Sequence, residues 1–220
     1  MINWNEIQTV FLDMDGTLLD LHFDNHFWRD YVPEQYAIRH EMTVEEARAD
    51  LFPRFESAEG TMDWYCVDYW SKELKLDIAA LKHNLKHLIR IRPHTIEFLD
   101  ALRELGHRLV LVTNAHNKSL ALKMEVTLIS GHFDRLICTH DIGIPKENFD
   151  FWDQLQQVEK FDKKTTLLVD DSLSVLESAK QYGIKNLLAI SHPDLKAEAR
   201  TIEGFDAIQH FSELMPLIKS

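Results

Sequence analysis

Short apolar runs alternate with amphipathic stretches along most of this chain. Residues 10–12 form an apolar run that is typical of a strand buried on both faces. From about residue 92 onward the alternation is regular, and it predicts strands at 108–113, 135–139, 165–170 and 186–190. Helices are predicted in the same region at 95–105, 118–128, 148–159 and 174–181. Strands separated by helices indicate a parallel sheet covered on both faces, so the pattern predicts an α/β fold with a doubly wound parallel sheet.

The stretch between residues 20 and 90 has a different pattern. It is rich in aromatic residues, and it lacks the alternation and β-branched content of strands. Four helices are predicted there: over 25–40 with an interruption at Pro33, from Thr43, from Thr61, and from Asp77 to about residue 88. We therefore expect two parts, a core of residues 1–19 and 91–220 and an all-helical insertion of residues 20–90.

Composition narrows the classes of partner and location. The net charge of −12 argues against a nucleic-acid polymer or an anionic membrane surface as a partner, because both require a basic face. The two cysteines give no disulfide framework, which favours a reducing compartment. The N-terminus has no basic start followed by a long apolar run, and no segment reaches the 18 or so apolar residues of a membrane span. We expect a cytoplasmic protein.

Polar side chains follow the predicted core strands. Asp13 and Asp15 follow the first strand, and Gly16 permits a sharp turn after them. The remaining groups are Thr113 and Asn114 after the second strand, Lys146 after the third, and Asp170 and Asp171 at the fourth. The first pair alone fits an ordinary polar turn about as well as a site. Ligands bind beyond the carboxyl ends of parallel strands, however, and the joint placement of these groups predicts one site at that edge.

The charge of this predicted site requires a cation. Four carboxylates and one lysine leave a charge of −3 in one crevice, which would repel a phosphate and raise the carboxylate pKa values. A divalent ion reduces that charge to −1, and Mg²⁺ is the ion that prefers carboxylates, water and a substrate phosphate as ligands. The sequence therefore predicts a Mg²⁺-dependent site.

The same residues resemble a known family. The segments 13–17, 113–114, 146 and 169–172 are similar to the four motifs of the haloacid dehalogenase-like hydrolase superfamily. The resemblance implies a Rossmann-like core with a helical cap between the first and second motifs. It also implies that Asp13 is the nucleophile that forms an aspartyl-phosphate. Asp15 would be the general acid and base, with its backbone carbonyl on the metal.

The resemblance assigns the remaining motif residues as well. Thr113 and the Asn114 amide would hold phosphate oxygens, and Lys146 would neutralise charge on the nucleophile and the phosphoryl group. Asp170 and Asp171 would anchor Mg²⁺ together with Asp13 and Asp15. The dehalogenating members lack an acid at the position of Asp15, so its presence favours phosphoryl transfer over dehalogenation.

A narrower resemblance concerns the substrate. The segments 20–28, 63–70, 113–116 and 145–147 resemble bacterial nucleotidases that cleave GMP and IMP. This implies a small phosphomonoester substrate, a purine nucleoside 5′-monophosphate. The sequence leaves open whether the protein is a monomer or a homodimer. Two alternatives stay open: a sugar-phosphate phosphatase or phosphomutase of the same superfamily, and a non-catalytic nucleotide-binding protein. The intact motifs argue against lost catalysis, and the absence of P-loop and Gly-x-Gly-x-x-Gly patterns argues against an NTPase or a dehydrogenase.

Three residues of the helical insertion are candidates for substrate contact. Trp64 could stack on a purine, although such a ring more often belongs to the packing between helices. Asp24 and Asn25 could reach the ribose or a base edge, or could cap a helix. His116 could approach the substrate or have no role, and the simplest interpretation of Cys66 is a buried apolar filler.

Overall fold

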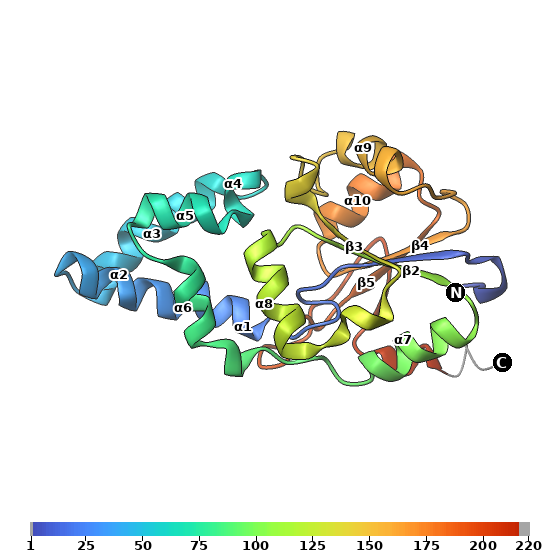
Figure 1. Ribbon diagram of the computed structural model, residues 1–220, viewed down its shortest axis with the longest axis horizontal. Helices are drawn as coiled ribbons and strands as arrows, with labels where there is room; N and C mark the ends of the chain where they lie inside the picture. Colours follow the sequence, from blue (N-terminus) through green and yellow to red (C-terminus); the bar gives the residue numbers. More distant parts are fainter. Residues whose placement is uncertain (1, 216–220) are drawn as a thin grey trace.

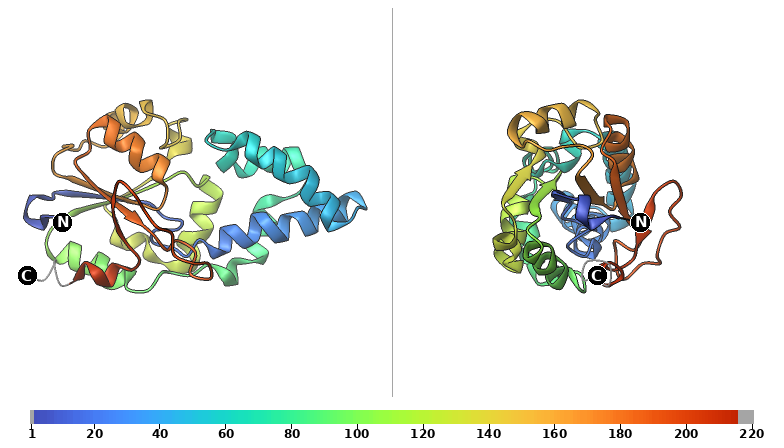
Figure 2. Two further views of the ribbon diagram at one scale, coloured as in Figure 1. Left: turned by 180° about the vertical axis from the view of Figure 1, so that it is seen from behind. Right: turned by 90° about the vertical axis from the view of Figure 1, so that its right-hand side faces the viewer.

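The computed structural model describes residues 2–215. Figures 1 and 2 show two parts, a sheet with helices on both faces and a group of helices that projects from one end of it. The sheet contains six parallel strands in the order β3-β2-β1-β4-β5-β6. Their bounds are Thr9–Leu12 (β1), Arg108–Thr113 (β2), Arg135–Cys138 (β3), Thr166–Asp170 (β4), Asn186–Ile190 (β5) and Asp206–Ile208 (β6). This confirms the predicted doubly wound α/β fold.

The central strand β1 shows why the sheet must be covered on both faces. Phe11 pairs in register with Val110 of β2 and Leu168 of β4. The side chain of Phe11 packs into one apolar cluster, while Val10 and Leu12 pack into another. Successive side chains of a strand point to opposite faces, so the run of buried residues in β1 supplies both cores.

Four helices cover the two faces. They are α7 (Thr95–Glu104), α8 (Asn117–Thr127), α9 (Asp150–Val158) and α10 (Leu173–Tyr182). In Figure 1, α7 and α8 lie on one side of the sheet and α9 and α10 on the other. Phe98 of α7 and Leu120 of α8 belong to the cluster of Val10, whereas Trp152 of α9 and Leu176 of α10 belong to the cluster of Phe11.

The projecting part is entirely helical among the described residues. It contains α1 (His22–His26), a π-helical segment (Phe27–Tyr31), α2 (Val32–His40), α3 (Val44–Ala58), α4 (Met62–Tyr65), α5 (Val67–Leu74) and α6 (Ile78–Asn84), followed by a 3₁₀ turn (Lys86–Leu88). Its buried side chains, among them Phe27, Leu51 and Trp70, form an apolar cluster separate from the two clusters of the sheet. A separate core is what an independent domain requires.

The chain passes between the two parts twice, and the two passages lie side by side. The backbone N–H of Asp20 donates to the carbonyl of Arg90 (2.9 Å), and Leu19 forms an antiparallel bridge with Ile91. These contacts lie where the sequence analysis places the boundaries between core and insertion. Together with the separate core, they support our proposal that residues 20–90 are a cap domain.

Three local expectations need correction. Pro33 does not interrupt a helix: α2 begins at Val32, directly after the π-helical segment, so Pro33 lies in a first turn where its missing N–H is tolerated. The helix expected from Thr61 is broken at Cys66, whose extended backbone separates α4 from α5. The short strand β6 follows Gly204 and was not predicted, because three residues are too few for a periodic pattern.

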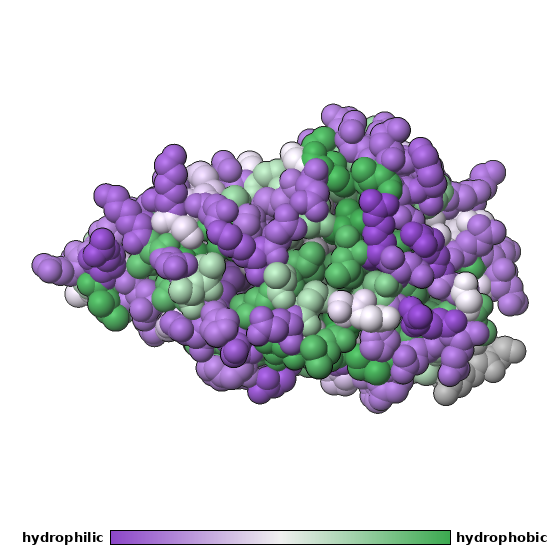
Figure 3. All heavy atoms as spheres, in the orientation of Figure 1, coloured by the Kyte–Doolittle hydropathy of each residue, from purple (hydrophilic) through white to green (hydrophobic). Residues whose placement is uncertain are grey.

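Figure 3 shows that hydrophilic residues cover most of one face and that hydrophobic residues gather near its middle. Within the described residues, the longest and most apolar helices still fall short of what is needed to cross a bilayer.

Candidate active site

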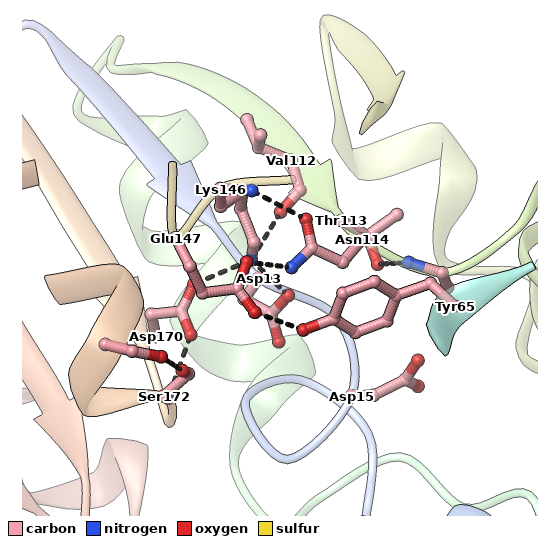
Figure 4. A network of polar contacts seen from close by, with 12 residues as sticks. Asp13, Asp15, Tyr65, Val112, Thr113, Asn114, Lys146, Glu147, Asp170 and Ser172 are labelled. Atoms are coloured by element: carbon pink, nitrogen blue, oxygen red, sulfur yellow. Dashed lines mark hydrogen bonds and ion pairs between the residues drawn. The ribbon is translucent and has the colours of Figure 1, made fainter. Parts of the chain in front are cut away.

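The predicted site residues meet where the core strands end. Asp13 follows β1, Asn114 follows β2, Lys146 lies in the loop after β3 and Asp170 ends β4. Figure 4 shows these side chains converging on one another from separate strands and loops. The parallel strand order brings β2, β1 and β4 next to each other, so their carboxyl ends share one edge of the sheet.

Lys146 is at the centre of this network. Its Nζ donates to Oδ1 of Asp13 (2.6 Å), to Oδ2 of Asp170 (2.7 Å) and to the carbonyl of Val112 (3.1 Å). Three acceptors satisfy the three N–H groups of an ammonium ion, and the side chain is almost fully buried. Burial alone lowers the pKa of Lys146, but the two carboxylates outweigh it and raise the pKa above its ordinary value. Lys146 is therefore charged and fixed between two acids.

Asp170 and Asp171 are neighbours in sequence but have different surroundings. Asp170 accepts from Lys146 through one oxygen and from the backbone N–H of Ser172 (2.9 Å) through the other. The Asp171 carboxylate makes only a long ion pair with Arg200 (3.7 Å) among the described residues. Asp171 therefore has fewer polar partners than Asp170, and its oxygens are more available to a bound ion.

Three carboxylates form a set that fits a hard divalent cation. Asp13, Asp170 and Asp171 each offer an oxygen atom, and these atoms lie within 4.8 Å of one another. Burial raises the pKa of Asp13 to about 6, against the attraction of Lys146. Burial and repulsion from Asp13 and Asp170 raise the pKa of Asp171 well above its usual range. The group holds more negative charge than Lys146 neutralises, and carboxylate oxygens are the donors that Mg²⁺ prefers.

Gly16 makes room for Asp171. Its backbone has a φ of +83°, and a Cβ atom at this position would lie 2.6 Å from Cγ of Asp171. Any other residue would be strained at this φ and would also collide with the carboxylate. The turn after the first motif and the position of Asp171 therefore depend on the same glycine.

Asp15 faces a second group of charges. Nζ of Lys123, from α8, lies 2.6 Å from Oδ1 of Asp15 and 2.5 Å from Oδ2 of Asp24. Lys82, from α6, donates to the other oxygen of Asp24 (2.9 Å). Burial raises the pKa of Asp15 to about 6, with Lys123 opposing it. A half-buried carboxyl group with that pKa can give and take a proton near neutral pH.

This second group changes the predicted charge of the site. The sequence alone predicts four carboxylates balanced by Lys146, but the side chain of Asp15 is neutralised by Lys123 and lies outside the set of three carboxylates. The assigned contact between the Asp15 backbone carbonyl and the metal stays a prediction. The negative charge that requires a cation therefore lies on Asp13, Asp170 and Asp171.

Thr113 and Asn114, the two residues predicted to bind phosphate, make different hydrogen bonds. The hydroxyl oxygen of Thr113 accepts from the backbone N–H of Ala115 (3.0 Å), which leaves its hydrogen free to donate. The Asn114 side chain accepts from the backbone N–H of Lys146 (3.0 Å) and donates to Glu147 (2.7 Å). Thr113 is thus suited to hold a phosphate oxygen. The geometry of the Asn114 side chain favours positioning the Lys146 loop.

A cleft of about 1090 Å³ is lined by residues of both parts of the molecule, among them Asp13, Asp15 and Lys146. Trp64 lines this cleft, and its ring makes an edge contact with Phe55. The size suits a small organic ligand. The structure brings the candidate chemistry and the candidate ring to the same space.

Asp24 and Asn25, the other two candidates for substrate contact, already have polar partners within the protein. Both carboxylate oxygens of Asp24 accept from lysines, and attraction to Lys123 and Lys82 outweighs burial and lowers its pKa to about 2. Asn25 donates to Asp194 of the core (2.8 Å). Their contact with a substrate stays a prediction, and the geometry shows them tying the cap to the core.

Several residues of the site were missed by sequence reasoning. Lys123 is almost fully buried, yet a single lysine in an amphipathic helix normally indicates a solvated face. The hydroxyl of Tyr65, from α4, donates to Glu147 across the cleft, as Figure 4 shows. Tyr65 and Glu147 lie within segments that carry the nucleotidase resemblance, which was the available signal. Arg200 lies in a loop without any pattern.

Comparison with known proteins gives the family. A family model described as haloacid dehalogenase-like hydrolase matches residues 7–183. The chain is 38% identical over 215 residues to the GMP/IMP nucleotidase YrfG of Escherichia coli (strain K12), which covers 98% of this chain and 97% of that protein. The nucleotidase of the same name from Shigella flexneri matches with the same identity and coverage.

Solved structures agree on the fold. A HAD phosphatase from Thermococcus onnurineus superposes with a TM-score of 0.80 at 22% identity, over 96% of this chain and 98% of that one. A putative beta-phosphoglucomutase from Thermotoga maritima superposes with a TM-score of 0.68 at 17% identity, over 97% of this chain and 99% of that one. The family match spans the strands and loops that carry the converging carboxylates and Lys146. The chain therefore belongs to the haloacid dehalogenase-like hydrolase family.

Proposed function

We propose that this protein is a Mg²⁺-dependent phosphomonoesterase that acts through an aspartyl-phosphate on Asp13, and that its substrate is a purine nucleoside 5′-monophosphate such as GMP or IMP. The observation that carries the chemistry is the placement of Lys146 between Asp13 and Asp170, with Asp171 alongside. The end-to-end similarity to nucleotidases named for GMP and IMP supports the substrate class.

In the first step, the carboxylate of Asp13 attacks phosphorus and the leaving oxygen takes a proton. Lys146 holds one oxygen of Asp13 and so fixes the direction of the carboxylate while stabilising negative charge on the phosphoryl group. The Thr113 hydroxyl donates to a phosphoryl oxygen. Asp15 supplies the proton, for which a pKa of about 6 is suitable.

In the second step, Asp15 takes a proton from water, the water attacks the aspartyl-phosphate, and Asp13 is restored. Asp13, Asp170 and Asp171 would hold Mg²⁺, which when bound neutralises the charge that these carboxylates and the phosphate bring together. Lys123 keeps the carboxylate of Asp15 in place through both steps.

The cap supplies selectivity in this proposal. The volume of the cleft is sufficient for a nucleoside, and Trp64 lines it, where its ring would stack on a purine. Closure of the cap would exclude bulk water from the phosphorylated carboxylate. We also expect a cytoplasmic location, since the proposed substrates are cytoplasmic metabolites and both cysteines are free.

Phosphate release from a panel of nucleoside monophosphates and sugar phosphates, with Mg²⁺ and with chelator, tests the proposal. We expect Mg²⁺-dependent release that is greatest with GMP and IMP. Release mainly from sugar phosphates would retain the chemistry and overturn the substrate class. Full activity in chelator would overturn the metal requirement, and no release from any substrate would favour a nucleotide-binding protein.

A further inference from the structure

A second group of metal-ligating side chains lies at the boundary between cap and core. Cys66 comes from the break between α4 and α5, His116 from the loop after β2, and His140 from the turn after β3. One ligand atom of each residue lies within 4.8 Å of those of the other two. Three segments that are far apart in sequence, one from the cap and two from the core, thus place a thiol and two imidazoles together.

The histidine rings are arranged as a site and not as solvated side chains. Both ring nitrogens of His140 are enclosed, and neither has a hydrogen-bond partner among the described residues. Enclosed polar atoms without partners are costly and therefore rare in proteins. The rings of His116 and His140 meet edge to face, with centroids 4.8 Å apart. His140 thus carries an unsatisfied lone pair beside a second imidazole.

The polar groups around the thiol and His116 are also placed as at a metal site, although one oxygen of Asp68 is already paired with Nζ of Lys118 (2.5 Å). The backbone N–H of Tyr69 points at Sγ of Cys66 (3.4 Å), as it would at a thiolate. A carboxylate oxygen of Asp68 lies 3.7 Å from Nε2 of His116, and metal-bound histidines commonly donate their free N–H to such a group. The Lys118 backbone N–H donates to Nδ1 of His116 (3.2 Å), and the ion would replace this hydrogen bond.

From these contacts we propose that Cys66, His116 and His140 form a site for a thiophilic divalent ion such as Zn²⁺, which fastens the cap to the core. One sulfur and two imidazole ligands select Zn²⁺ over the Mg²⁺ that suits three carboxylates. Around one tetrahedral Zn²⁺, bonds of about 2.0 to 2.3 Å place ligand atoms about 3.3 to 3.6 Å apart. The three ligand atoms all lie within 4.8 Å of one another and are therefore close enough to share one such ion, with at most small adjustments of the side chains.

An ion shared by cap and core has a consequence for the cleft. His116 lines the cleft, and Cys66 directly follows Tyr65, which already contacts Glu147 of the core. An ion at this site holds the cap closed over the inner carboxylates. If the protein is the phosphatase proposed above, on which this consequence rests, occupancy slows product release and inhibits turnover.

Co²⁺ is the probe for the site, because a thiolate bound to Co²⁺ gives a charge-transfer absorption band that carboxylate or imidazole ligands alone do not. The titration uses the full chain in excess Mg²⁺, which occupies the carboxylates. We expect one equivalent of Co²⁺ to produce the band and Zn²⁺ to abolish it by competition. Cys66→Ser should lose the band, and His140→Asn should weaken Co²⁺ binding at least about tenfold.

Cys138→Ser is the matched control. Cys138 is buried, its thiol donates to the carbonyl of Ala115 (3.1 Å), and it lies outside the proposed ligands. This variant should keep the band. Circular dichroism confirms that each variant is folded. Absence of the band in the wild-type protein, or its persistence in Cys66→Ser, would overturn the site.

The inhibitory consequence has its own test. Micromolar Zn²⁺ added in excess Mg²⁺ should slow phosphate release by the wild-type protein and by Cys138→Ser, and should do so much less in Cys66→Ser. Equal inhibition of all three would show that Zn²⁺ acts at the carboxylates and would overturn the consequence. The absorption band is independent of turnover, so a failure of the proposed phosphatase activity leaves the metal site testable.

Discussion

At the scale of single residues, two buried lysines divide the carboxylates of the site into two groups. Lys146 holds Asp13 and Asp170, whereas Lys123 holds Asp15 and pairs it with Asp24 of the cap. The nucleophile Asp13 and the acid Asp15 are therefore paired with different lysines. This separation allows Asp13 to be ionised while Asp15 is protonated, as the first chemical step requires.

Removal of Lys123 should therefore disturb Asp15 selectively. Lys123→Met leaves Asp15 without its cation and beside the Asp24 carboxylate, which keeps only Lys82, so the pKa of Asp15 rises. We expect kcat/KM to fall about tenfold or more, since a general acid supplies about 10² to 10⁴ in rate. Because Asp15 acts as an acid in the first step, the alkaline limb of the kcat/KM profile should move to higher pH.

Lys82→Met is the matched control for this prediction. Lys82 is equally buried and also contacts Asp24, but it makes no direct contact with Asp15. Each variant removes one partner of a buried ion pair, which costs about 3 to 5 kcal/mol of stability, so both are measured at a temperature where they are folded. The same alkaline shift in both variants would contradict the role given to Lys123.

Gly16 provides a second test at this scale. Gly16→Ala places a Cβ 2.6 to 3.0 Å from the Asp171 carboxylate atoms, so the carboxylate must shift from its present place beside Asp13 and Asp170. We expect the Mg²⁺ concentration for half-maximal activity to rise about tenfold, a loss of about 1.4 kcal/mol of binding free energy.

The matched control is Gly143→Ala. Its φ of +84° carries the same backbone strain, but nothing lies within 4 Å of the added atom. It should cost stability without weakening Mg²⁺ activation. Similar Mg²⁺ requirements for the two variants would indicate that backbone strain, and not displacement of Asp171, is responsible.

At the scale of elements, the cap reaches the core through α4. The hydroxyl of Tyr65 donates to Glu147, which also accepts from Asn114. Asn114 in turn accepts from the backbone N–H of Lys146. A chain of hydrogen bonds therefore connects the position of the cap to the loop that carries the central lysine (Figure 4).

Loss of the Tyr65 hydroxyl should weaken this connection. Tyr65→Phe removes one hydrogen-bond donor from the half-buried carboxylate of Glu147, which costs about 1 to 3 kcal/mol of stability. We expect kcat/KM for the preferred nucleotide to fall about tenfold, with kcat for a small aryl phosphate changed less, since that substrate depends less on the cap. Steady-state kinetics with both substrates measure the difference.

Tyr69→Phe is the control for this prediction. It removes the same atom from the neighbouring helix α5, where the hydroxyl makes no hydrogen bond among the described residues. An equal loss in Tyr65→Phe and Tyr69→Phe would contradict the connection through Glu147.

Most elements of the core, with the exception of the short strand β6, were predictable, because β1, β2 and β4 are buried apolar runs and α7 has apolar residues at helical spacing. Asp13, Lys146 and Asp170 were predictable for the same reason, since strand ends in a parallel sheet share one edge. Lys123 and Tyr65 were not. Their roles arise when the cap folds onto the core, and that contact depends on no local pattern. The break at Cys66 was hidden in an aromatic run that looks helical throughout.

At the scale of the whole molecule, the acidic cluster links stability to pH and to Mg²⁺. Burial raises the pKa of Asp13 to about 6, and burial and repulsion raise that of Asp171 well above 3.8. The folded protein therefore holds protons that the unfolded chain has lost. These carboxyls stabilise the fold below about pH 4, and their contribution is lost as the pH rises through their folded pKa values.

Mg²⁺ should reverse this loss, because it binds the ionised carboxylates. We expect the rise in Tm produced by Mg²⁺ to be larger at about pH 8 than at about pH 5, where protons compete for the same oxygens. Calorimetry in Mg²⁺ and in chelator at both pH values measures it. Asp171→Asn should reduce the rise, and an equal rise at both pH values would contradict a carboxylate site.

The covalent step on Asp13 is the central claim, and trapping it is the most direct test. With an aryl phosphate, the leaving group departs without help from an acid, so Asp15→Asn should complete the first step and stall before hydrolysis. We expect a burst of one aryl alcohol per active site, and one phosphoryl group on the peptide that contains Asp13 when the quenched protein is analysed by mass spectrometry. Linear release without a burst or a modified peptide, together with undiminished turnover by Asp13→Asn, would contradict the account.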